Sequence, residues 1–128
     1  MIAFVLVCLI ASLSRLVYAV TDRYTLIISV QTVIGIFGPV ERVVINGQSP
    51  GPILRTTLGN TVEVLVINGM SSTNPSDGMT GIGELTTVHF HGINQRGSPY
   101  SDGVQEVSQC VLTTVPGNYS FLYHFTVF

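Results

Sequence analysis

Thr61-Val62-Glu63-Val64-Leu65-Val66-Ile67 is the clearest strand pattern in the chain. Val62, Val64 and Val66 alternate with their neighbours, and a β-strand turns alternate side chains to one face of its sheet. The intervening residues are partly apolar, so we expect both faces to be at least partly covered. The Gly59-Asn60 pair in front predicts a turn. The segment therefore predicts a β-strand and favours a β-rich fold.

The remaining β-rich runs are short and are separated by Gly, Pro, Asn and Ser, and no long stretch has helical periodicity. These runs are Tyr24 to Val33, Val40 to Ile45, Leu85 to Phe90, Gln109 to Thr113 and Tyr119 to Phe128. The Asn46-Gly47 pair closes the second of them with a turn, and alternate residues from Phe121 to Val127 share one side of the last. Six or seven short strands without helices predict an all-β, antiparallel sandwich or barrel of about 100 residues.

Composition and charge exclude two broad classes. The chain has 128 residues, of which 46% are apolar and 9% are charged, whereas a disordered chain needs low hydrophobicity and high net charge. This length suffices for one domain and not for two. Five arginines and no lysine against seven acidic residues give a net charge of -2, which leaves no basic face for nucleic acid.

The N-terminal segment has the pattern of a secretory signal peptide. An apolar run extends from Ile2 to Ala11, and Val17-Tyr18-Ala19 supplies small residues at the positions that signal peptidase reads. The alternative is a membrane anchor, but the run is shorter than the ~20 residues that span a bilayer. We predict that residues 1–19 are removed and that residues 20–128 form a secreted, extracellular domain with no membrane span.

Cleavage leaves Cys110 as the only cysteine of the mature sequence. An unpaired cysteine in an exported protein indicates a partner on another chain, a reactive thiol, or a sequence that lacks the matching half. Asn118-Tyr119-Ser120 is a sequon with an allowed middle residue. Asn118 is therefore a candidate for glycosylation, with an unmodified turn residue as the alternative.

Thr86-Thr87-Val88-His89-Phe90-His91-Gly92 holds the most informative residues. In an extended strand His89 and His91 project from the same face, with Cα atoms about 7 Å apart, while Phe90 points away. That separation suits two ligands of one metal ion or one ligand each for two neighbouring ions, and imidazole favours zinc or copper. A pair of histidines also arises by accident, so the motif alone is a weak indication of a metal site.

Asp102 lies shortly after this pair, in the turn-rich segment Tyr100-Ser101-Asp102-Gly103. Its carboxylate has two possible roles. It either returns to the histidines and orients an imidazole or a bound water, or it accepts a turn hydrogen bond ahead of Gly103. Spacing alone leaves both interpretations open.

Taken together, these residues resemble the N-terminal cupredoxin domain of the multicopper oxidases, and of laccases in particular. The resemblance covers nearly all of residues 20–128, and its landmarks stand in the order of the family. They are Ile45-Asn46-Gly47-Gln48-Ser49-Pro50-Gly51-Pro52-Ile53, Gly59-Asn60-Thr61-Val62 with Val66-Ile67-Asn68, Val88-His89-Phe90-His91-Gly92, Ser101-Asp102-Gly103, Ser108-Gln109-Cys110 and Tyr119-Ser120-Phe121-Leu122-Tyr123-His124-Phe125. The resemblance implies a cupredoxin-like Greek-key β-sandwich or barrel.

The resemblance also implies a function. Laccases oxidise phenolic or similar donors at a type 1 copper and reduce dioxygen to water at a trinuclear copper cluster. On the family's first His-x-His motif, His89 would bind the type 2 copper and His91 a type 3 copper. Asp102 matches the acid near the type 2 copper that is thought to assist proton delivery. Cys110 matches a cysteine that forms a disulfide with a C-terminal segment of laccases.

Several family landmarks are not present in these residues. The second His-x-His motif is expected just beyond Phe128, and the later histidine pairs and type 1 ligands belong to further cupredoxin domains. We therefore expect residues 20–128 to be an incomplete N-terminal domain that supplies two cluster ligands and is inactive alone. His124 occupies a position that is not a ligand in the family, and we interpret it as a sheet residue.

Two other functional classes fit the sequence less well. A single-domain blue-copper carrier needs a cysteine followed closely by histidine, but the next histidine after Cys110 is His124, and no methionine follows. An adhesion-type sandwich needs two core cysteines around a tryptophan, whereas this sequence has no tryptophan and only one cysteine after Ala19. A ferroxidase-type multicopper oxidase and a non-catalytic extracellular binding protein with the same fold remain alternatives.

Overall fold

The structure is a computed structural model that describes residues 19–70, 85–114 and 119–128. Most of the expected signal peptide and the sequon residue Asn118 lie outside these residues. Among the described residues, no helix is both long and apolar enough to cross a bilayer.

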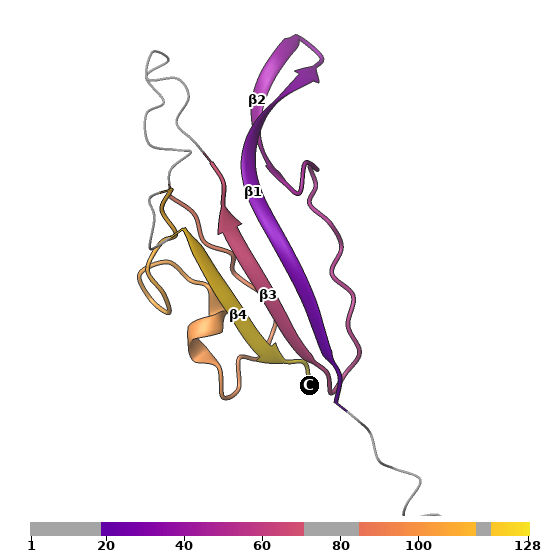
Figure 1. Ribbon diagram of the computed structural model, residues 1–128, viewed down its shortest axis with the longest axis vertical. Helices are drawn as coiled ribbons and strands as arrows, with labels where there is room; N and C mark the ends of the chain where they lie inside the picture. The colour runs from indigo at the N-terminus through magenta and orange to yellow at the C-terminus, as the bar shows by residue number, and fades with distance from the viewer. Residues whose placement is uncertain (1–18, 71–84, 115–118) are drawn as a thin grey trace, which may run out of the picture.

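Within the described residues, four strands form one sheet in the order β2-β1-β3-β4 (Figure 1). Strand β1 pairs antiparallel with β2 and parallel with β3, and β3 pairs antiparallel with β4. One 3-10 helix, η1, follows β3 in the chain and precedes β4. The bounds are β1 Thr21–Gly35, β2 Gly38–Ile45, β3 Thr61–Asn68, η1 Pro99–Asp102 and β4 Ser120–Thr126.

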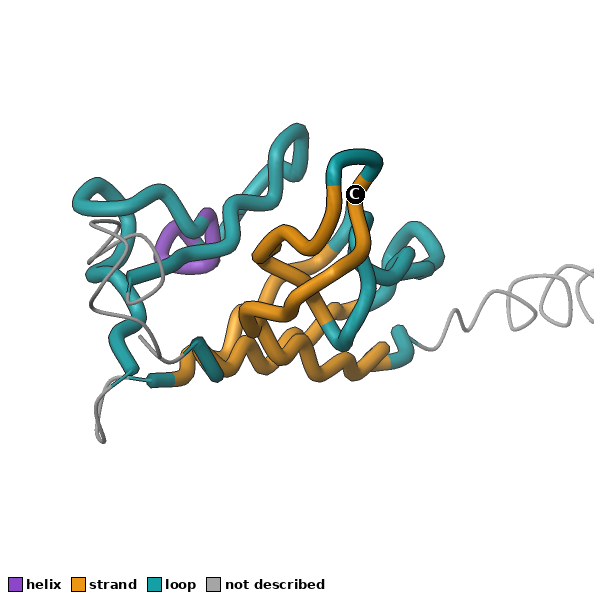
Figure 2. The backbone as a smooth tube through the Cα atoms, turned by 90° about the horizontal axis from the view of Figure 1, so that it is seen from above, coloured by secondary structure: helices purple, strands orange, loops and turns teal. Residues whose placement is uncertain are grey.

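The core lies on one face of this sheet. Val62, Val64 and Val66 of β3 are almost fully buried, as the alternation of the sequence predicts. Buried residues from β1, β4 and the following loops complete the cluster: Leu26, Ile28, Met70, Leu112, Tyr123 and Phe125. Figure 2 shows the helical turn and the loops around it to one side of the strands. The loop segment 85–114 thus contributes to the core and is held by it.

The predicted Asn46-Gly47 turn is present at the end of β2. Both residues have positive φ, +52° for Asn46 and +73° for Gly47, a conformation that asparagine and glycine tolerate best. The side chain of Asn46 then returns to β1, where its Oδ1 accepts the amide of Ile27 at 2.7 Å and its Nδ2 donates to the carbonyl of Thr25 at 2.9 Å. The turn therefore ties the loop after β2 to the neighbouring strand.

The all-β prediction is confirmed, but two predicted strands are wrong in detail. Leu85 to Phe90 and Gln109 to Thr113 make only isolated bridges, Thr86 with Leu112 and Gln105 with Gln109. Contacts with side chains replace some of the backbone hydrogen bonds that a paired strand would make there. The amide of Val88, for example, donates to the Tyr123 hydroxyl. The β1–β3 pair is parallel, whereas the sequence predicted an antiparallel fold.

Candidate metal centre

The two histidines of the His-x-His motif stand side by side outside the core. Phe90, between them, turns inward and packs on Tyr123 and Phe125, with ring centroids 5.2 and 4.8 Å away. The rings of His89 and His91 are exposed, with centroids 5.8 Å apart and planes at 85°. The predicted placement of the two imidazoles on one side is therefore present, and both side chains are exposed.

The backbone carbonyl of Asp102 orients His89. It lies 2.7 Å from Nδ1 of His89, whereas the carboxylate Oδ1 of Asp102 is 3.5 Å from the same nitrogen, beyond a good hydrogen bond. A carbonyl oxygen only accepts, so in the neutral imidazole Nδ1 carries the proton and Nε2 has the free lone pair. His89 is therefore prepared to bind a metal through Nε2, and Asp102 acts on it chiefly through its backbone.

Gly103 lets the segment that carries Asp102 pack closely against the histidine segment. Gly103 ends η1 at φ +79°, a left-handed conformation that favours glycine. A Cβ at this position would overlap the carbonyl oxygen of Val88 and lie 2.6 Å from the carbonyl carbon. Only a residue without a side chain lets the two backbones approach so closely. The Asp102 carbonyl also accepts the amide of Phe90 at 3.3 Å.

Strand β4 holds both halves of this arrangement. The buried hydroxyl of Tyr123 accepts the amide of Val88 at 3.1 Å, next to His89. The amide of His124 donates to the hydroxyl of buried Ser101 at 2.9 Å, next to Asp102. Burial raises the pKa of the Tyr123 phenol above its usual 10.0, a shift that the hydrogen bond from Val88 opposes. The phenol is therefore neutral near pH 7.

Two imidazoles are a partial donor set. Among the described residues there is no group of three or more His, Cys, Asp or Glu side chains that could hold a metal. Imidazole nitrogens suit copper and zinc, and such ions take more than two ligands. The residues present therefore fit part of a copper site, whose other ligands would have to be water or come from other residues.

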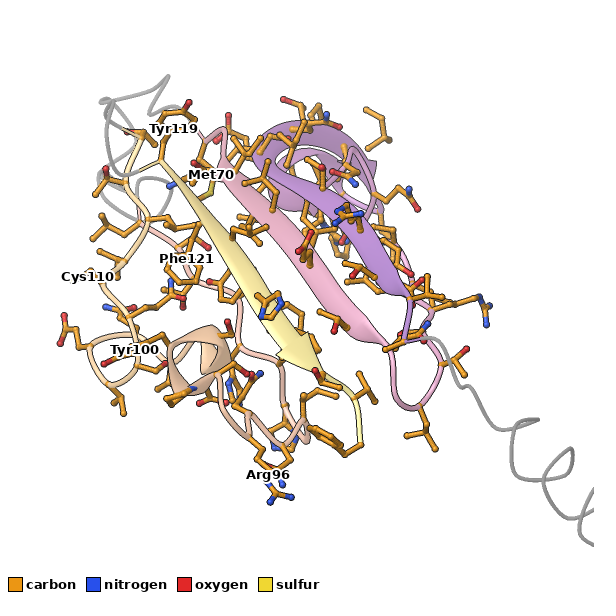
Figure 3. All side chains as sticks on the ribbon, turned by 60° about the horizontal axis from the view of Figure 1, so that its bottom comes forward. Met70, Arg96, Tyr100, Cys110, Tyr119 and Phe121 are labelled. Carbon is orange, nitrogen blue, oxygen red and sulfur yellow. The ribbon has the colours of Figure 1, made fainter. Side chains whose placement is uncertain are left out.

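The other predicted site residues lie apart from the pair. Cys110 is exposed and, within the described part of the chain, is a free thiol; Figure 3 shows it at the outside of the loop segment. His124 is exposed on the face of β4 opposite to Tyr123 and Phe125, in register with Glu63. Its side chain is thus a sheet residue, as predicted, although its backbone supports the Asp102 segment.

Sequence reasoning missed two supports of the site. The alternation of the last strand puts Tyr123 on one side with Phe121 and Phe125, but nothing local indicates that its hydroxyl reaches Val88, 35 residues away. Gly103 was noted only as part of an Asp-Gly element, and its close approach to Val88 leaves no local signal. The only local indication of a tight turn at Gly103 is the glycine itself, preceded by the acidic residue Asp102.

Comparisons with known proteins agree with this architecture. A family model described as multicopper oxidase matches residues 29–128. An L-ascorbate oxidase of Cucurbita maxima is 42% identical over 83 residues, which are 65% of this chain and 12% of that protein. An iron transport multicopper oxidase of Saccharomyces cerevisiae is 38% identical over 82 residues, which are 64% of this chain and 11% of that protein. The chain thus spans about 12% of the length of the curated relatives it matches.

Solved structures give the same answer at the level of the fold. The laccase from Botrytis aclada matches 85% of this chain and 18% of its own, with a TM-score of 0.67 and 27% sequence identity. A multi-copper oxidase from Pseudomonas thermotolerans matches with a TM-score of 0.64 at 29% identity, over 85% of this chain and 23% of its own. The fold is therefore all-β and cupredoxin-like. The chain belongs to the multicopper oxidase family, as the sequence motifs predicted.

Proposed function

We propose that this chain supplies the first pair of copper ligands in a secreted, laccase-like multicopper oxidase. His89 would bind the type 2 copper and His91 a type 3 copper of a trinuclear cluster that is completed by later cupredoxin domains. The observation that carries the proposal is the arrangement of the two exposed rings, 5.8 Å apart, with Nδ1 of His89 held by a carbonyl and Nε2 left free.

The side chain of Asp102 would have a role of its own in the proposed chemistry, in addition to the contact of its backbone carbonyl with His89. Bound copper would pass electrons from a reducing substrate to dioxygen, which is reduced to water. That reduction consumes protons, and the carboxylate of Asp102 is one-third exposed beside His89. We propose that this carboxylate holds protons next to the copper site and releases them toward it.

The reducing substrate is proposed to be a phenolic or similar organic donor. The relative from Cucurbita maxima named as an L-ascorbate oxidase is 42% identical to this chain, which supports a small organic reductant. Iron is the second candidate, because the iron transport oxidase of Saccharomyces cerevisiae is 38% identical. The chain alone is proposed to be inactive, since it would hold only two of the cluster ligands.

Three further proposals concern the full-length protein. Residues 1–19 act as a signal peptide that directs it to the extracellular space. Cys110, exposed here, forms a disulfide with a C-terminal segment of the larger protein. Asn118 carries an N-linked glycan.

Copper binding by the 128-residue chain tests the central proposal. We expect the chain to bind Cu(II) weakly, with nitrogen couplings in its electron paramagnetic resonance spectrum, because two imidazoles leave positions to water. His89→Ala and His91→Ala should each lower the affinity by at least about tenfold. His124→Ala is the matched control, since this exposed ring lies on the other face of β4 and should not affect binding.

Two outcomes contradict the proposal. Equal copper affinity in the chain and in the His89 and His91 variants would show that the pair is not the site. A tight, stoichiometric copper ion with a blue absorption band would show that the chain forms a complete site of another kind, because that band requires a cysteine thiolate ligand.

A further inference from the structure

We propose that Tyr123 is a positioning residue for His89, acting through the backbone amide of Val88. This inference rests on the proposed role of His89 as a copper ligand. Tyr123 touches neither histidine ring in the described contacts, and its side chain is completely buried in the core. Its effect on the metal centre would therefore be to fix the backbone from which the His89 ring projects.

The hydroxyl of Tyr123 replaces a missing strand partner. The histidine segment pairs with a neighbouring segment only at the Thr86–Leu112 bridge, where the two backbones exchange hydrogen bonds at 2.8 and 3.0 Å. Two residues later, the amide of Val88 donates to the Tyr123 hydroxyl at 3.1 Å. Without this hydroxyl the Val88 amide would lose its acceptor against the apolar core, and the chain would have to move to hydrate it.

The ring of Tyr123 holds the other side of His89. Phe90 packs edge-on against Tyr123 with centroids 5.2 Å apart, and Phe121 packs on the same ring at 4.8 Å. Tyr123 therefore contacts the residue before His89 through a hydrogen bond and the residue after it through an aromatic contact. In Figure 3, Phe121 of β4 lies toward the loop segment, consistent with this cluster.

By fixing the backbone on both sides of His89, this double contact would maintain the hydrogen bond with Asp102 that determines the His89 tautomer. The proton on Nδ1 is favoured because the Asp102 carbonyl lies 2.7 Å away, and that distance holds only while the His89 backbone keeps its position beside Asp102. If the Val88 amide moves, the Nδ1 contact lengthens and the preference for a free Nε2 declines. Loss of an outer-shell partner of a ligating histidine typically lowers metal affinity about 10- to 100-fold.

Tyr123→Phe tests this role, with Tyr24→Phe as the matched control. The hydroxyl of Tyr24 also accepts a backbone amide, that of Arg55 at 3.2 Å, but on a segment distant in sequence from the histidines. Each variant loses one phenolic acceptor and keeps its ring. Nitrogen NMR of His89 reports the tautomer without metal, and Cu(II) titration reports the affinity.

We expect Tyr123→Phe to shift His89 toward a mixture of tautomers and to weaken copper binding about tenfold, with neither effect in Tyr24→Phe. An unchanged tautomer and affinity in Tyr123→Phe would overturn the inference, as would equal losses in both variants. If the chain itself binds no copper at His89, the proposed function fails, while the tautomer measurement still decides the role of Tyr123. If Tyr123→Phe does not fold, hydrogen exchange of Val88 in the unmodified chain decides: a protected amide supports the contact, and an unprotected one overturns it.

Discussion

Replacing Gly103 with alanine should destabilise the chain more than the same change at any other described glycine of similar conformation. Gly103 and Gly97 have nearly the same backbone angle, φ +79° and +81°. They differ in their surroundings, because a Cβ at Gly103 would overlap the carbonyl oxygen of Val88, whereas nothing lies within 4 Å of a Cβ at Gly97. The pair therefore separates the cost of a left-handed residue from the cost of a steric overlap.

The expected magnitudes follow from these contacts. A left-handed conformation costs an L-residue about 1–2 kcal/mol, and this applies equally to both positions. At Gly103 the overlap must also be relieved by moving the Asp102 segment away from Val88, which breaks the contacts of the Asp102 carbonyl with the Phe90 amide and with His89. At about 1 kcal/mol for each hydrogen bond, the total loss becomes roughly 3–4 kcal/mol.

Urea unfolding followed by circular dichroism measures the two variants against the unmodified chain. Gly97→Ala should lower the free energy of unfolding by about 1–2 kcal/mol and Gly103→Ala by about 2 kcal/mol more. Equal losses in the two variants would refute the reasoning, because they would mean that the backbones of Val88 and Gly103 do not approach as closely as the structure has them.

Two further predictions concern pH. Burial raises the pKa of the Tyr123 phenol above 10.0, so its contribution to the free energy of unfolding is complete below pH 10 and is lost as the pH rises through the folded-state pKa. Unfolding measured at increasing alkaline pH should show this decline in stability. A Tyr123→Phe variant with the same decline would contradict the prediction. Hydrogen bonds from Asn60 and Thr56 hold the pKa of Asp22 below 3.8, so its contribution is complete above that pH and is lost as the pH falls toward the folded-state value. Asp22→Asn should flatten the acid limb of the stability profile, and an identical limb in that variant would argue against the Asp22 contacts.

Local sequence patterns predict those features that depend only on neighbouring residues, such as the alternation along a strand and the residue types of a turn. Alternation from Val62 to Val66 identified the buried face of β3, and Asn46-Gly47 identified a turn because its backbone angles require such residues. The parallel pairing of β1 with β3 was not predictable in this way. It brings Thr21 opposite Thr61, and nothing in either local pattern specifies a partner 40 residues away. The sequence predicted no helix, and the four-residue helix η1 lies in the segment that it described as rich in turns.

The candidate site was predictable only as far as side-chain direction is fixed by the strand repeat. His89 and His91 were expected on one side because residues two apart in a strand share a face, and their rings do lie together although this segment forms only the isolated Thr86–Leu112 bridge. The sequence indicates a role only for the carboxylate of Asp102, yet the atom that orients His89 is its backbone carbonyl oxygen. Residue types carry no signal for such a contact, since every residue has the same carbonyl.

The position of β4 in the chain has a consequence for the time at which the site can form. During translation the histidine segment is synthesised first. Tyr123 and His124, which make hydrogen bonds with Val88 and Ser101, follow some 30 residues later. Until Ser120–Thr126 joins the sheet, the histidine and Asp102 segments lack the hydrogen bonds of Val88 with Tyr123 and of His124 with Ser101. Under the proposed function, metal binding is therefore expected to follow the completion of this strand, and a nascent chain halted before it would present the histidines without these two supports.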